Sequence, residues 1–302
     1  MKRPVNKFLL KTLLFVIPVL AFFEVLFRSG FAPIVTNSTL FDIKMLNVQK
    51  HHIKNVTLLA AGSSETLYEL NSKIIVQNFH IPYYNFSSWG MQVTDTKVLL
   101  KSLVQKYHPK YVIMCSSIGE FIYPKNDTYL NYINASNFIK DDFPELFYFK
   151  KYNSIHQVIR RKLTTYPLKL DDWGGTSLNI KPKDINQQKW NEHGIFPTGY
   201  TSQNYTALNS LGAYLAQQNI KFIFVQVPIK KSYTNTTSSK QLILAHLDKC
   251  RAIVEKQRGI YLNYYNTTIF TDNLFTDQYH LQDAGAVILT KEIVADLKKV
   301  IR

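Results

Sequence analysis

Cysteine is scarce in this chain of 302 residues, where only Cys115 and Cys250 occur. Two isolated thiols do not form a disulfide framework, and a domain of this size does not need one to be stable. They do not make a zinc site either, and no His-Glu-x-x-His pair is present. We therefore expect two ordinary buried or free thiols, and no metal or other cofactor.

Glycine is also sparse, with 11 residues, and none of them form the glycine-rich motifs of nucleotide-binding proteins. A Gly-x-Ser-x-Gly elbow is missing, which argues against the α/β-hydrolase fold. No internal repeat or low-complexity linker is apparent. Aromatic residues, in contrast, make up 14% of the chain, which is enough to build a full core. These features predict one large domain, or one domain with an insertion.

Acidic residues are outnumbered, since 21 Asp and Glu stand against 36 Lys and Arg and leave a net charge of +15. Such a basic surface suits anionic lipid headgroups or anionic envelope polymers. A diffusely Lys-rich, solvated face without a specific partner would explain the same excess. No recognised nucleic-acid motif appears, so a nucleic-acid partner is not expected.

One long apolar run, residues 8–27, is long enough to cross a bilayer. Four basic residues precede it or lie at its start: Lys2, Arg3, Lys7 and Lys11. By the positive-inside rule they place a short N-terminus in the cytoplasm and the main domain in the periplasmic or extracellular space. A cleaved signal peptide is the alternative, but no small-x-small cleavage site follows the run. We therefore expect an uncleaved, single-pass anchor.

The rest of the chain alternates strand and helix patterns, which predicts an α/β three-layer sandwich with a central parallel sheet. We predict strands at residues 55–61, 83–86, 111–115, 222–227 and 260–264. Helices are predicted at residues 65–79, 93–107, 205–218 and 239–256, with a last helix capped by Asp283. An aromatic, turn-rich stretch at about 122–200 interrupts this rhythm and is predicted to be an inserted cap over the carboxyl edge of the sheet. The predicted organisation is therefore a cytoplasmic tail and anchor (1–28), a stalk (29–53), and one domain (54–302).

Two distant stretches carry the residues of a serine-hydrolase site. Ser64 follows the first predicted strand, and Asp277 lies three residues before His280. A serine hydroxyl needs a base to take its proton, and that base needs a group that orients its ring. Ser64 could also be a helix-capping serine, and Asp272 is a second possible partner for His280. The combination of the two stretches favours Ser64 as nucleophile, His280 as base and Asp277 as the orienting acid.

In their order along the chain, these residues resemble the SGNH, or GDSL-like, hydrolase family. The first family block is similar to Gly62-Ser63-Ser64, and the second to the segment from Asn85 to Gly90. The last block, Asp-x-x-His-Leu with a following Gly-Ala, is similar to Asp277–Leu281 with Gly285-Ala286. The resemblance implies an SGNH or flavodoxin-like fold over about residues 54–300, and it implies that the backbone N–H of Gly90 contributes to the oxyanion hole. Gly90 could equally be a turn glycine.

This sequence departs from the family pattern at two positions. Ser63 replaces an aspartate of the first block, and the third block, Gly-x-Asn-Asp, is replaced by Ser117-Ile118-Gly119-Glu120. The family's oxyanion-binding asparagine is therefore absent, and losing such a donor costs about 10²-fold or more in rate. Ser116, Ser117 or a residue of the insertion could replace it, and we place Ser117 in the predicted site.

The Gly-Ser-Ser-Glu form of the first block, behind a single anchor, is similar to the envelope acyl-transfer branch of the family. That branch includes the D-alanyl transfer protein of teichoic-acid synthesis and the alginate acetylation proteins. The resemblance implies an esterase or O-acyltransferase that acts on an envelope glycan or anionic polymer, beside a multi-pass acyltransferase. A catalytically inactive glycan-binding or scaffolding protein of the same fold remains the alternative. The three tryptophans, Trp89, Trp173 and Trp190, fit core packing better than sugar platforms.

Overall fold

A five-stranded parallel sheet forms the centre of the computed structural model, which describes residues 2–28, 36, 38–122, 132, 135, 136, 139, 169–179, 202–234 and 236–301. The strand order is β2-β1-β3-β4-β5. The strands are β1 (Leu58–Ala60), β2 (Tyr83–Asn85), β3 (Tyr111–Ser116), β4 (Lys221–Gln226) and β5 (Ile260–Asn263). This is the flavodoxin-like order, so the predicted α/β fold class is confirmed.

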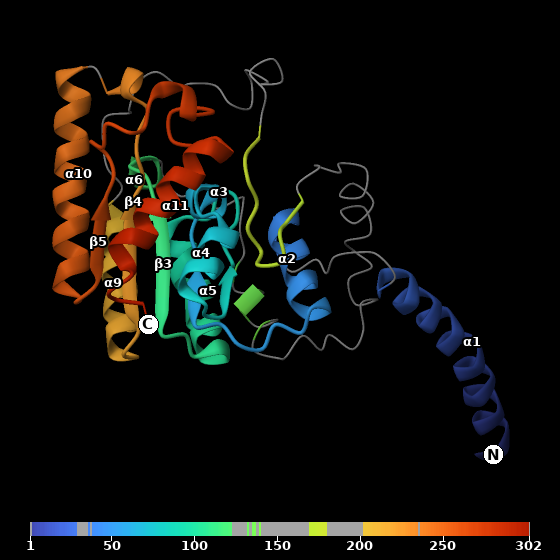
Figure 1. Ribbon diagram of the computed structural model, residues 1–302. Helices are drawn as coiled ribbons and strands as arrows, with labels where there is room; N and C mark the ends of the chain where they lie inside the picture. Colours follow the sequence, from blue (N-terminus) through green and yellow to red (C-terminus); the bar gives the residue numbers. More distant parts are fainter. Residues whose placement is uncertain are drawn as a thin grey trace.

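Helices cover both faces of the sheet (Figure 1). On one face α5 (Val93–Tyr107) packs against α9 (Ser202–Gln217), and α9 packs against α10 (Thr237–Lys256). On the other face α11 (Asp283–Leu297) packs against α3 (Ser64–Glu69) and α4 (Ser72–Phe79). Three short elements complete the described part of the domain: α6 (Gly119–Ile122), η3 (Lys231–Tyr233) and η4 (Asp272–Leu274).

The strands are buried on both sides because their apolar residues alternate between two cores. Leu58 and Ala60 contribute to the core under α4 and α11. Leu59, between them, contributes to the core under α5 and α9. A strand buried on both faces needs a continuous apolar run, and this is why the sequence pattern could locate each strand.

A helix that precedes the first strand also belongs to the core. In α2 (Thr39–Lys50), the hydroxyl of Ser38 accepts a hydrogen bond from the Phe41 N–H at 3.3 Å and so caps the helix start. Phe41 and Met45 are buried in the same core as α5 and α9. This segment lies within the range predicted as a stalk, whereas the structure packs it against the domain.

The amino-terminal helix α1 (Lys2–Arg28) extends away from the sheet domain (Figure 1). Its stretch Pro4–Val25 has a mean hydropathy of 2.2 and no buried share, so it is long and apolar enough to cross a membrane. A membrane anchor and a signal sequence both fit this description. The predicted orientation across the membrane stays a prediction.

Two local details differ from the sequence prediction. The single helix predicted at 65–79 is two helices, because the Asn71 side chain accepts the Ile74 N–H at 3.1 Å and starts a new helix there. The last helix is capped by Gln282, and Asp283 is its first residue instead of its cap. Most of the predicted insertion at 122–200, including Trp190, lies outside the described residues.

Candidate active site

The turn after β1 places Ser64 at the start of a helix. Ser63 is the N-cap of α3, and its hydroxyl accepts the Glu65 N–H at 3.3 Å. Ser64 is therefore the first helical residue and not the cap, which leaves its side chain free of a capping role. The Thr66 hydroxyl donates to the Cys115 carbonyl at 2.8 Å and so ties this turn to β3. Gly62 is required here, since a Cβ on it would lie 2.2 Å from the Thr66 hydroxyl oxygen.

Three predicted residues meet in one hydrogen-bonded chain at the carboxyl edge of the sheet. The Ser64 hydroxyl oxygen lies 2.8 Å from His280 Nε2, although the two residues are 216 positions apart. His280 Nδ1 lies 2.8 Å from Asp277 Oδ2. The other carboxylate oxygen of Asp277 accepts the backbone N–H groups of Tyr279 and His280 at 2.9 and 2.8 Å. Asp277 is thus fixed by its own turn and can hold the imidazole ring in one orientation.

The electrostatics of this chain favour a charged His280. Burial lowers the pKa of the imidazole, but the charge of Asp277, the hydrogen bond to it and the charge of Glu65 outweigh burial and raise the pKa to about 9. Burial raises the pKa of Asp277, while the charge of His280 and three hydrogen bonds lower it below its usual value overall. Both side chains remain partly open to solvent, with exposed fractions of 15% and 13%. The pair therefore behaves as an imidazolium and a carboxylate at neutral pH.

Asp272, the alternative partner for His280, has another role in the structure. Its carboxylate accepts the N–H groups of Lys231 and Ser232 at 3.0 and 3.3 Å and so joins η4 to η3. The orienting position beside His280 belongs to Asp277.

A cavity of about 370 Å³ opens beside Tyr68, a neighbour of His280, but neither Ser64 nor His280 is among its lining residues. The ring of Tyr68 forms one wall and meets the His280 ring edge-on, with centroids 6.0 Å apart. The Trp89 indole N–H donates to the Tyr68 hydroxyl. Trp173, which is half-buried against the core, forms another part of the wall. Polar lining residues include Asn71, Ser72, Lys73, Asp171, Thr176 and Asp283. The cavity combines aromatic surface with several hydrogen-bonding groups, as small-molecule pockets do.

The loop that carries Gly90 lies next to the nucleophile turn. The Ser88 N–H donates to the Gly62 carbonyl at 3.1 Å. Gly90 has a φ of +63°, which favours glycine, and its Cβ position is open space. Within the described part of the chain, the backbone N–H of Gly90 has no protein acceptor. This amide is therefore available for an oxyanion, although no contact with Ser64 fixes its direction.

Lys44 of α2 braces the same loop from the opposite side. Its side chain has no exposed surface, and its Nζ donates to the carbonyl of Asn85 at 2.9 Å and to that of Ser87. Burial lowers the pKa of Lys44 well below its usual value, while the charge of Asp171 acts in the opposite direction. Sequence analysis missed this residue. Its one signal was a lysine on the apolar side of a helical pattern, in a range predicted to be a stalk.

Ser117 does not fit its predicted place in the oxyanion site. Its side chain is fully buried, and its hydroxyl donates to Glu65 Oε1 at 2.6 Å. A hydroxyl has one hydrogen to donate, so Ser117 cannot also donate to an oxyanion while this bond exists.

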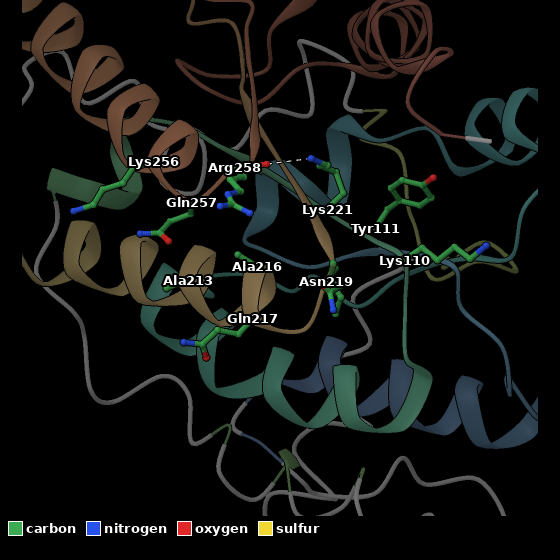
Figure 2. Close-up of a pocket in the computed structure, with 11 residues that line it drawn as sticks. Lys110, Tyr111, Ala213, Ala216, Gln217, Asn219, Lys221, Lys256, Gln257 and Arg258 are labelled. Carbon is green, nitrogen blue, oxygen red and sulfur yellow. Dashed lines mark hydrogen bonds between the residues drawn. The ribbon is translucent and has the colours of Figure 1, made fainter.

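A second cavity lies at the opposite, amino-terminal edge of the sheet, where β3 and β4 begin (Figure 2). It has a volume of about 680 Å³, and its charged lining residues are all cations: Lys110, Lys221, Lys256 and Arg258. The Lys221 ammonium donates to the carbonyl of Arg258 at 3.2 Å, as Figure 2 shows. The ends of α9 and α10 meet here, and helix C-termini favour cations. Among the described residues, no group of three His, Cys, Asp or Glu is arranged to hold a metal.

The chain is similar to solved structures only at low identity. No protein-family model matches it, and no curated protein matches it either. A predicted acylhydrolase from Bacteroides fragilis is 11% identical, with a TM-score of 0.46 over 87% of this chain and 98% of the other. An acetylxylan esterase from Geobacillus stearothermophilus is 12% identical, with a TM-score of 0.46 over 81% and 96%. A predicted lipolytic protein of the G-D-S-L family from Desulfitobacterium hafniense is 9% identical, with a TM-score of 0.42 over 79% and 98%. Likeness at this level assigns neither a family nor an activity to the chain.

Proposed function

We propose that this protein is a serine esterase or O-acyltransferase, with Ser64 as nucleophile, His280 as general base and Asp277 as the residue that orients His280. The observation that supports it is the unbroken chain of two 2.8 Å contacts from the Ser64 hydroxyl through the imidazole to the Asp277 carboxylate. Nucleophile, base and orienting acid are already within hydrogen-bonding reach without any movement.

In the first half of the reaction, the Ser64 oxygen attacks the carbonyl carbon of an acyl ester. Its proton passes to His280 Nε2, and Asp277 stabilises the resulting imidazolium at Nδ1. Negative charge develops on the former carbonyl oxygen. The intermediate then collapses, the ester C–O bond breaks, and His280 returns the proton to the leaving alcohol. The acyl group remains on Ser64.

In the second half, water or a hydroxyl of an acceptor sugar attacks the acyl carbon. His280 takes the proton of the attacking group and returns it to the Ser64 oxygen as the acyl group leaves. The product is a free acid when water attacks, and a new ester when a sugar attacks. Hydrolysis and transfer therefore need the same three residues.

We propose that backbone N–H groups hold the oxyanion, from Ser64 and from Gly90. The family's asparagine is absent, and the Ser117 hydroxyl is bound to Glu65. With one donor fewer than such sites usually have, the intrinsic rate is expected to be about 10²-fold lower. A low intrinsic rate is compatible with an enzyme that acts on a tethered or locally concentrated substrate.

The proposed substrate is an acyl ester on an envelope glycan or related anionic polymer. Three features support this class: the cavity lined by Tyr68 and Trp173, whose Tyr68 ring meets the His280 ring edge-on, the apolar helix α1, and the net charge of +11 that remains of +15 once the +4 of residues 1–28 is set aside. An outward-facing domain on a single anchor would act on such a polymer beside a multi-pass acyltransferase that supplies the acyl group. Acyl incorporation into purified polymer, followed by mass spectrometry with and without membranes that carry the acyltransferase, would separate transfer from hydrolysis.

The nucleophile assignment can be tested with a fluorophosphonate probe, which labels activated serines. Full-length protein in detergent should be labelled and should hydrolyse aryl acetates, while Ser64→Ala should lose both activities. Ser238→Ala is the matched control, because Ser238 is exposed on α10 and its side chain contacts Thr236, far from the triad in the chain. Equal labelling of wild type and Ser64→Ala would overturn the assignment. Absence of turnover together with polysaccharide binding that His280→Ala leaves intact would favour the inactive binding protein.

A further inference from the structure

Glu65, directly after the proposed nucleophile, lies at the centre of a hydroxyl network that the triad chemistry does not use. Its carboxylate is buried between α3 and the loop after β3. Oε1 accepts the Ser117 hydroxyl at 2.6 Å. Oε2 contacts the Ser63 hydroxyl and lies 3.3 Å from the Ser64 hydroxyl oxygen. Three hydroxyl groups thus converge on one carboxylate, which is the arrangement that stabilises its anionic form.

The hydroxyl of Ser63 also contacts a second carboxyl group, Glu120 Oε1. Ser63 has one hydrogen, so it can donate to only one of the two glutamates and must accept from the other. One of the two carboxyls therefore carries a proton. The hydroxyl groups of Ser63, Ser64 and Ser117 all lie against Glu65, so we assign the proton to Glu120. Burial and the nearby charge of Glu65 raise the pKa of Glu120 well above its usual value, in agreement with this assignment.

Counting the hydrogen of Ser64 shows what Glu65 does for the triad. When His280 is neutral, Ser64 donates its hydrogen to Nε2 across the 2.8 Å contact. When His280 is protonated, Nε2 carries a hydrogen of its own and donates to the Ser64 oxygen. The Ser64 hydrogen then needs another acceptor, and Glu65 Oε2 is the acceptor in reach. Glu65 thus favours the imidazolium state of the base.

We propose that Glu65 is a second carboxylate that positions the catalytic centre, which receives the Ser64 hydrogen when His280 is protonated and which shares the Ser63 hydroxyl with Glu120. This inference rests on the proposed function, since it assigns a role in that same reaction. Asp277 stabilises the imidazolium at Nδ1, and Glu65 stabilises it from the Ser64 side. The two carboxylates approach the base from two different elements, α3 and the turn before α11.

The other ionisable groups around Glu65 leave this charge arrangement intact. They are Glu69 on α3, Cys115 on β3 and Glu120 on α6, together with Asp277 and His280. Burial raises the pKa of Glu69 and of Cys115 well above their usual values and so favours their uncharged forms. Glu65 and Asp277 are the two carboxyl groups whose charges raise the pKa of His280.

Two isosteric substitutions are expected to differ in their effect on the pKa of His280. Glu65→Gln removes a charge, so the pKa of His280 should fall by about one unit, and the acid limb of the pH–rate profile should shift downward by the same amount. Glu120→Gln replaces a neutral group with a neutral group that can still donate to Ser63, so the limb should not move. The rate of fluorophosphonate labelling against pH gives the limb, and NMR titration of the His280 ring gives the pKa without any turnover.

The outcomes separate this inference from the proposed function. A His280 pKa that stays at the wild-type value in Glu65→Gln overturns the role of Glu65, and so does an equal shift in Glu120→Gln. A wild type that the probe does not label overturns the proposed function, while the NMR titration still tests whether Glu65 acts on His280. If Glu65→Gln does not fold, Glu65→Ala should give the same downward shift. Failure of both to fold would show a purely structural carboxylate and would overturn the inference.

Discussion

The two edges of the sheet differ in how their charged residues are placed. At the carboxyl edge, Glu65 and Asp277 are largely buried, and each has a specific partner. At the amino edge, Lys221 and Arg258 are exposed around an open cavity. A parallel sheet with crossover helices sets this division, because helix N-termini point to one edge and helix C-termini to the other. The fold therefore favours acids at one edge and bases at the other, and burial together with specific partners shifts the pKa values of the acids at the carboxyl edge.

The largest effect is expected at the carboxyl edge, from Asp277→Asn. The amide keeps the shape of the side chain but removes the charge that stabilises the imidazolium. We expect kcat for aryl acetate hydrolysis to fall by about 10³- to 10⁴-fold, with a much smaller change in KM. Asp272→Asn is the matched control, since Asp272 joins η4 to η3 through its carboxylate. Its kcat should stay within a few-fold of the wild-type value. Similar losses in both variants would contradict the assignment of Asp277.

The raised pKa of His280 is expected to have a smaller effect, on the pH dependence of the rate. General-base catalysis needs the neutral ring, so kcat/KM should rise about tenfold per pH unit below the His280 pKa and level off near pH 9.

The raised pKa of His280 also affects the stability of the folded protein. Because the folded pKa is raised, the stabilisation from charged His280 is fully present below about pH 6.5 and is lost as pH rises through about 9. A rate profile that levels off near pH 6.5 would contradict the charge arrangement of the site.

The site residues that the sequence could predict are those that a short stretch of sequence identifies. Asp277 and His280 are three positions apart and form their contact within one turn. Ser64 follows an apolar strand, and in a parallel sheet the position after a strand already defines the edge. The alternation of apolar runs and helices predicted the parallel sheet in the same way, whereas the flavodoxin-like fold was implied only by the family resemblance.

What sequence could not predict depends on contacts between distant positions. Lys44 reaches carbonyls 41 and 43 positions away, and the Glu65 partner Ser117 is 52 positions away. Neither pair has a period or spacing that a pattern could detect. Ser117 was predicted to lie in the site because it follows β3. It does follow β3, but the sequence does not show that its hydroxyl points to Glu65. The break at Asn71 was missed because one capping side chain outweighed a continuous helical pattern.

The brace at Lys44 is expected to matter more for stability than for the chemical step. Lys44→Met keeps the apolar volume but leaves the carbonyls of Asn85 and Ser87 without this donor. Buried acceptors that lose a partner cost about 1–3 kcal/mol in the free energy of unfolding. Lys240→Met, on an exposed position of α10, is the matched control and should change this free energy by less than about 0.5 kcal/mol. Denaturant unfolding of both variants measures the difference, and equal values would show that the amine does not brace the loop.

The smallest effect on catalysis is expected at the amino edge. The cations there are exposed and lie at the far edge of the sheet from the triad, so solvent and salt screen their field at His280. The double variant Lys221→Gln/Lys256→Gln should therefore keep aryl acetate hydrolysis within about twofold. It should weaken binding to an anionic polymer at low salt if this cavity contacts the substrate, because that attraction is electrostatic. Unchanged binding would show that these lysines only complement the helix C-termini and do not contact the polymer. A large loss of hydrolysis would show that the two edges are coupled through the sheet.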